Sequence, residues 1–245
     1  MVSVVIPVFN GAKFLEEAVQ SVLKSTYRSF EILLIDDGSS DDSKKICRGL
    51  EAKHRGLIRF FPMPQNKGLG RVLNFALKKA RGTYIARLNQ DDIQLAYRLG
   101  TEVEYLNTHP NVVVVGSWNN LFDEEGNTQV LKFLATDEEI RNMWLLISPF
   151  SDPTTMYRKA AAIKAGGYIQ SYWPADDTQL WYRMGMLGKL ANIQKPLVNV
   201  RWHKGAGSVR FFRRMAFVTY RMHRWAHENV ARAPWYIQAW WMVQF

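Results

Sequence analysis

The chain has 245 residues, 47% of them hydrophobic, which is long enough to bury the core of one large α/β domain that carries a short tail. Its single cysteine, Cys47, excludes an intrachain disulfide and a cysteine-rich zinc site, and it predicts a reducing compartment. The first residues lack the features of a signal peptide, and no apolar run approaches the roughly 20 residues that a membrane span needs, so we expect a cytoplasmic protein.

The net charge of +10 is concentrated towards the C-terminus, where residues 201–235 hold eight Lys and Arg and one Glu. Aromatic side chains are interleaved with these charges or follow them: Phe211, Phe212, Trp225, Trp235, Trp240 and Trp241. This composition predicts an anionic partner, which could be phospholipid, nucleic acid or a phosphorylated substrate.

The first half of the chain alternates between two hydrophobic patterns. Apolar runs typical of buried strands cover residues 2–9, 30–35, 58–61 and 83–88. Apolar residues at helical spacing cover residues 15–23, 46–50 and 69–80. Such alternation predicts a mostly parallel sheet with helices on both faces, and ligands bind beyond the carboxyl ends of its strands. Three predicted loops at that edge are polar: residues 10–11, 36–43 and 89–92.

The second half is less regular. A buried strand is predicted at residues 112–115, followed by two strand-like segments around a turn at residues 123–127, which form a small antiparallel hairpin. Thr136 and Glu139 form a capping box that opens a helix to about residue 147. A further helix is expected at residues 176–187 and a last strand at residues 196–202.

Asp36 and Asp37 directly follow a predicted strand. A carboxylate at this position can accept hydrogen bonds from a base or a ribose. The same loop also has the features of a turn leading into a helix, with Ser40 or Asp41 as the cap. Both interpretations stay open for Asp36 and Asp37, whereas the capping role is favoured for Asp41 and Asp42.

Asn89, Asp91 and Asp92 also end a predicted strand. Adjacent carboxylates repel each other unless a cation or a donor offsets their charge, and Mg²⁺ or Mn²⁺ binds one or two carboxylates and fills its shell with phosphate oxygens and water. This pattern suits a nucleoside diphosphate, because the metal offsets charge on the departing diphosphate. The alternative is a pair of solvated aspartates that cap the next helix.

Two further polar groups stand in the second half. Asp176 and Asp177 open a predicted helix, where a carboxylate either caps the helix or accepts a proton from a hydroxyl group. His203 follows the last predicted strand and precedes a cationic, glycine-containing loop, so it either binds a phosphate or a metal or has a structural role.

Taken in order, these clusters closely resemble the family 2 glycosyltransferases, which have the GT-A fold. The resemblance covers residues 2–208 and is specific in its motifs. It is carried by residues 4–10, 35–41, 66–68 with Asn74, 82–92, 153–158, 166–168, 176–181 and 187–203.

The resemblance implies roles for particular residues. Nucleotide contacts fall on Pro7, Val8, Asn10, Asp37, Asn66, Gly68, Asn89 and Asp91. Asp37 would contact the base. Mn²⁺ or Mg²⁺ would be held by Asp91, Asp92 and His203. Asp177 would be the general base, with Asp176 beside it.

Two positions depart from the family pattern. Asn89 stands where the family usually has an aspartate, so its amide can bond a ribose but adds no negative charge for a cation. Asp176 stands where a glutamate is common, which shortens that side chain by one methylene group. The position of the base, Asp177, is retained.

The resemblance predicts an inverting transfer of a sugar from a nucleoside diphosphate sugar, by default a UDP-sugar, to an acceptor hydroxyl in cell-surface glycan or glycolipid synthesis. A dinucleotide-dependent oxidoreductase is disfavoured because residues 10–11 stand where a glycine-rich fingerprint would follow the first strand. The non-enzyme alternative is a basic membrane- or nucleic-acid-binding protein with a catalytically degenerate core.

The predicted organisation is a GT-A domain over residues 1–208, with a nucleotide-binding half at 1–92 and an acceptor-binding half at 93–208, and a basic, aromatic helical tail at 209–245. The tail either packs its aromatic face on the domain or contacts an anionic membrane peripherally. The second alternative would place the enzyme at the inner face of the plasma membrane, near a lipid-linked or polysaccharide acceptor.

Overall fold

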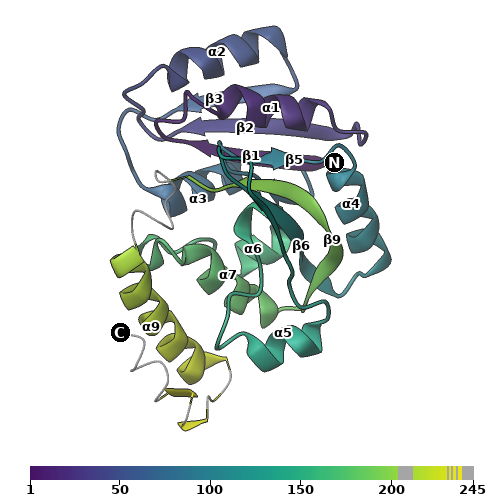
Figure 1. The fold of residues 1–245 in the computed structure, drawn as a ribbon, viewed down its shortest axis with the longest axis vertical. Helices are drawn as coiled ribbons and strands as arrows, with labels where there is room; N and C mark the ends of the chain where they lie inside the picture. The colour runs from purple at the N-terminus through teal and green to yellow at the C-terminus, as the bar shows by residue number, and fades with distance from the viewer. Residues whose placement is uncertain (204–211, 231, 233, 236, 239–245) are drawn as a thin grey trace.

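The computed structural model describes residues 1–203, 212–230, 232, 234, 235, 237 and 238. They form an α/β fold in which helices lie on both faces of one curved sheet (Figure 1). The strands are β1 (Val2–Val8), β2 (Phe30–Asp36), β3 (Ile58–Pro62), β4 (Tyr84–Arg87), β5 (Ile93–Gln94), β6 (Val112–Phe122), β7 (Thr128–Leu131), β8 (Met156–Arg158) and β9 (Lys189–Arg201). The helices are α1 (Leu15–Leu23), α2 (Ser43–Lys53), α3 (Leu69–Lys79), α4 (Arg98–Thr108), α5 (Asp137–Met143), α6 (Lys159–Lys164), α7 (Asp176–Gly185) and α9 (Phe212–Asn229), with 3-10 turns η1 (Asp152–Thr154) and η2 (Gln170–Tyr172).

The strands follow the order β3-β2-β1-β4-β8-β6-β9-β5, and β7 pairs with β6 outside this path. β1 to β4 are parallel, as the alternation of strands and helices predicts, and β6 and β9 are parallel to each other. β8 joins the two groups by antiparallel pairing with β4 and β6. The carboxyl ends of β1, β2 and β4 therefore meet at one edge, where the first three predicted polar loops lie.

Alternate side chains of β1 and β2 enter two separate cores, as the period of two in a strand requires. On one face Val4 and Ile6 pack with apolar residues of α1, α2 and α4. On the other face Val5 and Leu33 pack with apolar residues of α3, α5, α6 and α7. Burial on both faces explains why β1 and β2 have continuous apolar runs in the sequence.

Several predicted boundaries were wrong, although the elements exist. β6 continues to Phe122 because it pairs with β9 along most of its length, and β9 starts at Lys189 for the same reason. The predicted capping box at Thr136 is present, but α5 ends at Met143. α7 ends at Gly185. The N-cap position of α2 is Asp42, and the side chain that accepts from the N–H of Ser43 at the start of the helix is that of Asp41, so both aspartates lie at the helix start as predicted.

The described part of the tail is helical, as predicted. α9 buries Val218, Met222 and Ala226 in the same core as α3 and α7, so part of the tail packs on the domain. The predicted aromatic residues Phe211, Trp240 and Trp241 lie outside the described residues, as does the loop at 204–208. Within the described chain, none of the helices combines the length and apolar character required to cross a bilayer.

Candidate active site

Side-chain hydrogen bonds join the loops that follow β1 and β2. Asn10 has a positive φ of 50°, and its Oδ1 accepts a 2.8 Å hydrogen bond from the backbone N–H of Ser40. The N–H of Asn10 donates to Ser39 Oγ at 2.9 Å. Asp36 is buried and accepts from the N–H of Gly38 at 3.2 Å. Asp36 therefore stabilises its own turn and presents no carboxylate to the surface.

Asp37 fastens a third loop to this edge. Its carboxylate accepts hydrogen bonds from the backbone N–H groups of Lys67, at 2.6 Å, and Gly68, at 2.9 Å. Its own N–H donates to the carbonyl oxygen of Val8 at 2.7 Å. Burial raises the pKa of Asp37, although the two backbone donors oppose that shift. The carboxylate thus holds the segment before α3 against the end of β1.

The second loop and the segment before α3 are in direct contact. Gly38 has a φ of 77°, and a Cβ atom there would lie 2.6 Å from the backbone nitrogen of Asn66, so only glycine fits. The side chain of Asn66 is exposed, and Pro7 is partly exposed. The loops after β1 and β2 and the segment before α3, which carry Asn10, Asp37, Asn66 and Gly68, are therefore neighbours.

The third polar loop divides its two aspartates between different tasks. Asp92 is 1% exposed; its Oδ1 accepts from the N–H of Arg201 and its Oδ2 from the Asn89 side chain, both at 2.9 Å. Burial and the neighbouring charge of Asp91 raise the pKa of Asp92 to about 7. Asp91 instead reaches His203, with 2.9 Å between Oδ2 and Nε2.

The paired Asp91 and His203 side chains are the candidate ligands for a divalent cation at this edge. In the described part of the chain there is no group of three or more His, Cys, Asp or Glu arranged to hold a metal. Mg²⁺ and Mn²⁺ need few protein ligands when a diphosphate fills the remaining positions, so an oxygen and an imidazole nitrogen at this distance suit the ion. The ring of Phe14 lies 5.3 Å from that of His203 and helps to orient it.

A second cluster of carboxylates lies at the start of α7. Asp177 is partly exposed, and its Oδ1 accepts from the N–H of Thr178 at 2.7 Å. Burial, followed by the negative charges of Asp152 and Asp176, raises the pKa of Asp177 to about 8. Burial raises the pKa of Asp176 to about 7. A carboxylate with this proton affinity can act as a general base near neutral pH.

Contacts around α3 bring the two clusters together. A Cβ atom at Gly70 would lie 3.0 Å from Asp176 Oδ2, and Gln170 Oε1 accepts from the N–H of Arg71 at 3.2 Å. The segment that Asp37 holds through Gly68 is thus the segment that faces Asp176. Asp37, after β2, and Asp176, at the start of α7, therefore approach the same short segment at the start of α3.

A buried ion pair lies beside these carboxylates and was not predicted from the sequence. Arg87, at the end of β4, is fully buried, and its Nη2 donates to Asp152 Oδ2 at 2.7 Å and to Asn89 Oδ1 at 3.2 Å. A signal was present, because an arginine in a buried apolar strand requires an anionic partner. The partner itself is 65 residues away and cannot be read from local sequence.

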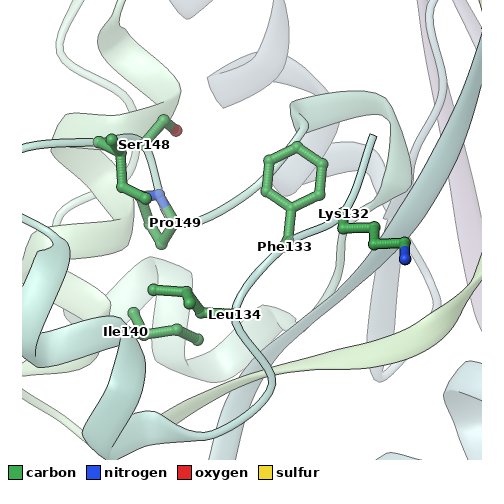
Figure 2. Close-up of a pocket in the computed structure, with 7 residues that line it drawn as sticks. Lys132, Phe133, Leu134, Ile140, Ser148 and Pro149 are labelled. Carbon is green, nitrogen blue, oxygen red and sulfur yellow. The ribbon is translucent and has the colours of Figure 1, made fainter. Parts of the chain in front are cut away.

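A hollow of about 310 Å³ opens next to α7 (Figure 2). Its walls are mostly apolar and include one cationic side chain. The residues that line it are Lys132, Phe133, Leu134, Ile140, Ile147, Ser148 and Pro149. Ser148 Oγ lies 3.0 Å from Thr178 Oγ1, and Thr178 directly follows Asp177. The hollow is therefore adjacent to the helix end that carries the candidate base.

Comparison with known proteins identifies the class to which this fold and site belong. The family model described as "Glycosyl transferase family 2" matches residues 3–166. The chain belongs to this family and is a glycosyltransferase, as the sequence resemblance predicted.

Two relatives are similar over most of the chain. The amylovoran biosynthesis glycosyltransferase AmsE of Erwinia amylovora is 32% identical over 204 residues, which cover 82% of this chain and 76% of AmsE. An Escherichia coli enzyme, UDP-Gal:alpha-D-GlcNAc-diphosphoundecaprenol beta-1,3-galactosyltransferase, is 29% identical over 78% of this chain and 70% of its own length.

Solved structures confirm the GT-A fold. TarS residues 1–349 of S. aureus, in complex with UDP-GlcNAc, superimpose with a TM-score of 0.77 at 19% identity, covering 99% of this chain and 72% of that one. The mannosyltransferase PcManGT of Pyrobaculum calidifontis, in complex with GDP-Man and Mn²⁺, gives a TM-score of 0.69 at 19% identity, covering 99% and 68%.

Proposed function

We propose that this glycosyltransferase moves a sugar from a UDP-sugar to an acceptor hydroxyl group with inversion at the anomeric carbon. The observation that carries this proposal is the link that Arg87 makes between Asn89, in the loop that carries Asp91, and Asp152, whose charge acts on Asp177. UDP appears in the name of the E. coli relative and in the TarS complex, which supports a UDP-sugar as donor. The non-enzyme alternative is not favoured, because the family and the paired acidic groups point to catalysis.

The donor nucleotide would lie over the joined loops of β1, β2 and β4. We assign its contacts to Pro7, Val8, Asn10, Asp37, Asn66, Gly68, Asn89 and Asp91. Since Asp37 already accepts two backbone hydrogen bonds, it shapes this surface and keeps its remaining lone pairs for a base N–H. Preformed loops of this kind lower the entropy lost when the nucleotide binds.

Asp91 and His203 would hold Mn²⁺ or Mg²⁺, and such an ion would offset the negative charge that develops on the leaving diphosphate. The Mn²⁺ in the PcManGT complex supports this part of the proposal. Asp92, the third residue that the sequence assigns to the metal, has both oxygens bonded to the protein. We expect Asp92 to act by fixing the backbone at Arg201, two residues before His203.

Asp177 would accept the proton of the acceptor hydroxyl. As that O–H bond breaks, the oxygen forms a bond to the anomeric carbon, and the bond from this carbon to the diphosphate oxygen breaks and releases UDP. The attack and the departure occur on opposite sides of the carbon, so its configuration inverts. The protein supplies mainly orientation and a proton acceptor. Asp176 remains beside the base as its charged neighbour.

A lipid-linked or polysaccharide acceptor fits the names of the two relatives, and we propose that the tail brings the enzyme to the inner face of the plasma membrane. α9 exposes Arg214, Arg221 and Arg224, and Phe217 is 61% exposed on the same helix. Arginine and an exposed aromatic ring together favour anionic lipid surfaces. In a flotation assay with vesicles that contain anionic lipid, the full chain should float with the vesicles, and a Phe217→Ser/Arg224→Ser variant should stay in the dense fraction. Equal, negligible binding by both would reject membrane contact.

The function is tested with a panel of nucleotide sugars in the presence of Mn²⁺ or Mg²⁺, with release of the nucleoside diphosphate as the readout. The parent should release UDP from one UDP-sugar when a glycan or lipid-linked acceptor is present. Asp177→Asn should lower this rate by about 10²-fold to 10⁴-fold while the donor still binds. Parent-level transfer by Asp177→Asn would reject the assignment of the base.

A further inference from the structure

Arg87 occupies a position between the two chemical groups of the site. Its Nη1 donates to the carbonyl oxygens of Val5, at 3.1 Å, and Leu88, at 3.3 Å, which fixes the plane of the guanidinium. Its Nη2 donates in two directions, to Asn89 Oδ1 on the nucleotide side and to Asp152 Oδ2 on the base side. A single nitrogen therefore links the loop after β4 to η1.

The hydrogen bonds continue from the Asn89 end of this link. Asn89 Nδ2 donates to Asp92 Oδ2, and Asp92 Oδ1 accepts from the N–H of Arg201. The Asp152 end carries no further side-chain hydrogen bond among the described residues, and Asp152 acts on the carboxylates of α7 through its charge. Hydrogen bonds therefore run from the strand that leads to His203, through Asn89 and Arg87, to Asp152.

The charges follow the same path. The positive charge of Arg87 lowers the pKa values of Asp92, Asp176 and Asp177 against the larger effect of burial. The negative charges of Asp152 and Asp176 raise the pKa of Asp177, and Asp152 is the larger of the two. Among the described residues, these three side chains, on β4, η1 and α7, are the main charged groups that act on Asp177.

Stability alone does not explain this arrangement. A buried ion pair commonly contributes no more to stability than apolar side chains of the same size. Here the pair also leaves Arg87 Nε and Asp152 Oδ1 without a hydrogen-bond partner among the described residues, which adds to its cost. A costly pair at the centre of a site is best explained by what it does to the groups around it.

We propose that Arg87 and Asp152 are positioning residues of the transfer reaction: the fixed guanidinium of Arg87 orients Asn89 on the nucleotide side and holds the carboxylate of Asp152 on the side of Asp177. This inference rests on the proposed function of Asp177. It goes further, because it makes the proton affinity of the base depend on a residue that reaches the nucleotide loop.

The test uses the pH dependence of kcat in the full chain. Asp152→Asn keeps an oxygen for Arg87 and removes the negative charge. The pKa of Asp177 should then fall, so the acidic limb of the profile should move to lower pH by about one unit. Asn89→Asp adds a carboxylate to the same Nη2 and offsets the positive charge of Arg87, so the limb should move to higher pH. It also removes the hydrogen bond that Asn89 Nδ2 donates to Asp92, so metal dependence is measured alongside the profile.

The two changes should not be additive. In the Asn89→Asp/Asp152→Asn double variant Arg87 again has one carboxylate partner, so the limb should return towards that of the parent. A purely structural pair would lower the melting temperature without shifting the limb. Asn89 is only partly buried, so Asn89→Asp carries the test if Asp152→Asn does not fold.

Unshifted limbs in the folded variants would overturn the inference. The proposed function fails in a different way, through full activity of Asp177→Asn. Loss of activity in Asp177→Asn together with unshifted limbs in Asp152→Asn and Asn89→Asp would reject only the role of the Arg87–Asp152 pair.

Discussion

The carboxylates of the two halves of the site differ in how they are satisfied. On the nucleotide side, Asp37 and Asp92 each accept two hydrogen bonds from the protein. On the acceptor side, Asp177 accepts bonds only from the adjoining Thr178, and Asp176 Oδ2 and Asp152 Oδ1 have no hydrogen-bond partner in the described part of the chain. The nucleotide surface is thus built by its own hydrogen bonds, whereas the acceptor side keeps carboxylates that are held by burial and charge.

This difference matches the two tasks of a transferase. A nucleotide site gains affinity when its loops are fixed before the ligand arrives. A general base needs a raised pKa, and few hydrogen bonds with nearby negative charge provide it. Substitutions on the nucleotide side should therefore change donor and metal binding, and those on the acceptor side should change proton transfer, stability against pH and acceptor binding.

The largest effect on the nucleotide side is expected from His203→Ala. Removing the imidazole leaves Asp91 as the remaining member of the pair, so the concentration of Mn²⁺ required for half-maximal rate should rise. kcat/KM for the donor should fall on the order of 100-fold, because the metal then stabilises the charge of the leaving diphosphate less well. The measurement is UDP release across a Mn²⁺ titration, with chelator added to the parent as a reference.

His109→Ala is the matched control, because His109 is exposed and stacks on Tyr105 away from the site. It should keep the metal dependence of the parent. An unchanged Mn²⁺ requirement in His203→Ala would separate His203 from the metal and leave Asp91 to act alone.

A smaller effect is expected from Asp37→Asn. The amide has one acceptor oxygen, so the backbone N–H of either Lys67 or Gly68 loses its partner. This loss should destabilise the ordered conformation of the loop by about 1–3 kcal/mol. The donor KM should rise about tenfold, with kcat little changed. Asp42→Asn is the control, since Asp42 is exposed and its side chain makes no capping hydrogen bond to α2. Equal KM values for both variants would show that Asp37 does not shape the donor surface.

The nucleotide half was also the half that could be predicted well from sequence. Continuous apolar strands, glycine and asparagine turns and helix-spaced residues are local signals, and they placed β1 to β4 and the loops at their ends. The positions of Asp37, Asp91 and His203 at one edge follow from parallel strand geometry. The separate task of Asp92 could not be foreseen, because it depends on the backbone of Arg201, which is 109 residues away.

The acceptor half depends on long-range pairing. β6 and β9 are longer than predicted because each completes the hydrogen bonds of the other, and short local windows do not contain that information. The same limit hid Asp152. Its sequence context resembles a turn before Pro153, and its importance comes from Arg87, which is 65 residues away on a strand that pairs with β8.

On the acceptor side, Asp176→Asn should stabilise the protein at high pH. Burial raises the folded-state pKa of Asp176 to about 7, above the ordinary value of 3.8. The neutral form therefore favours folding: its contribution is complete below about pH 4 and is lost as the pH rises through 7. At pH 8 the free energy of unfolding of the variant should be about 1–3 kcal/mol higher than that of the parent, and at pH 4 the two values should be equal. Denaturant unfolding at both pH values measures this difference, with Asp42→Asn as the control. A lower stability of Asp176→Asn than of the parent at pH 8 would contradict the raised pKa.

The smallest effect is expected from Phe133→Ala, which removes an aromatic wall of the hollow beside α7 (Figure 2). If an apolar part of the acceptor passes through this hollow on its way to Asp177, the acceptor KM should rise about threefold to tenfold, since a buried apolar contact contributes about 1 kcal/mol or more. The donor KM should not change, because the nucleotide loops hold their shape without Phe133. Val130→Ala, on the exposed side of β7, removes apolar surface outside the hollow and should leave both KM values unchanged. A rise in the donor KM instead would mean that the two sides of the site are not built independently, and the contrast between them would lose its basis.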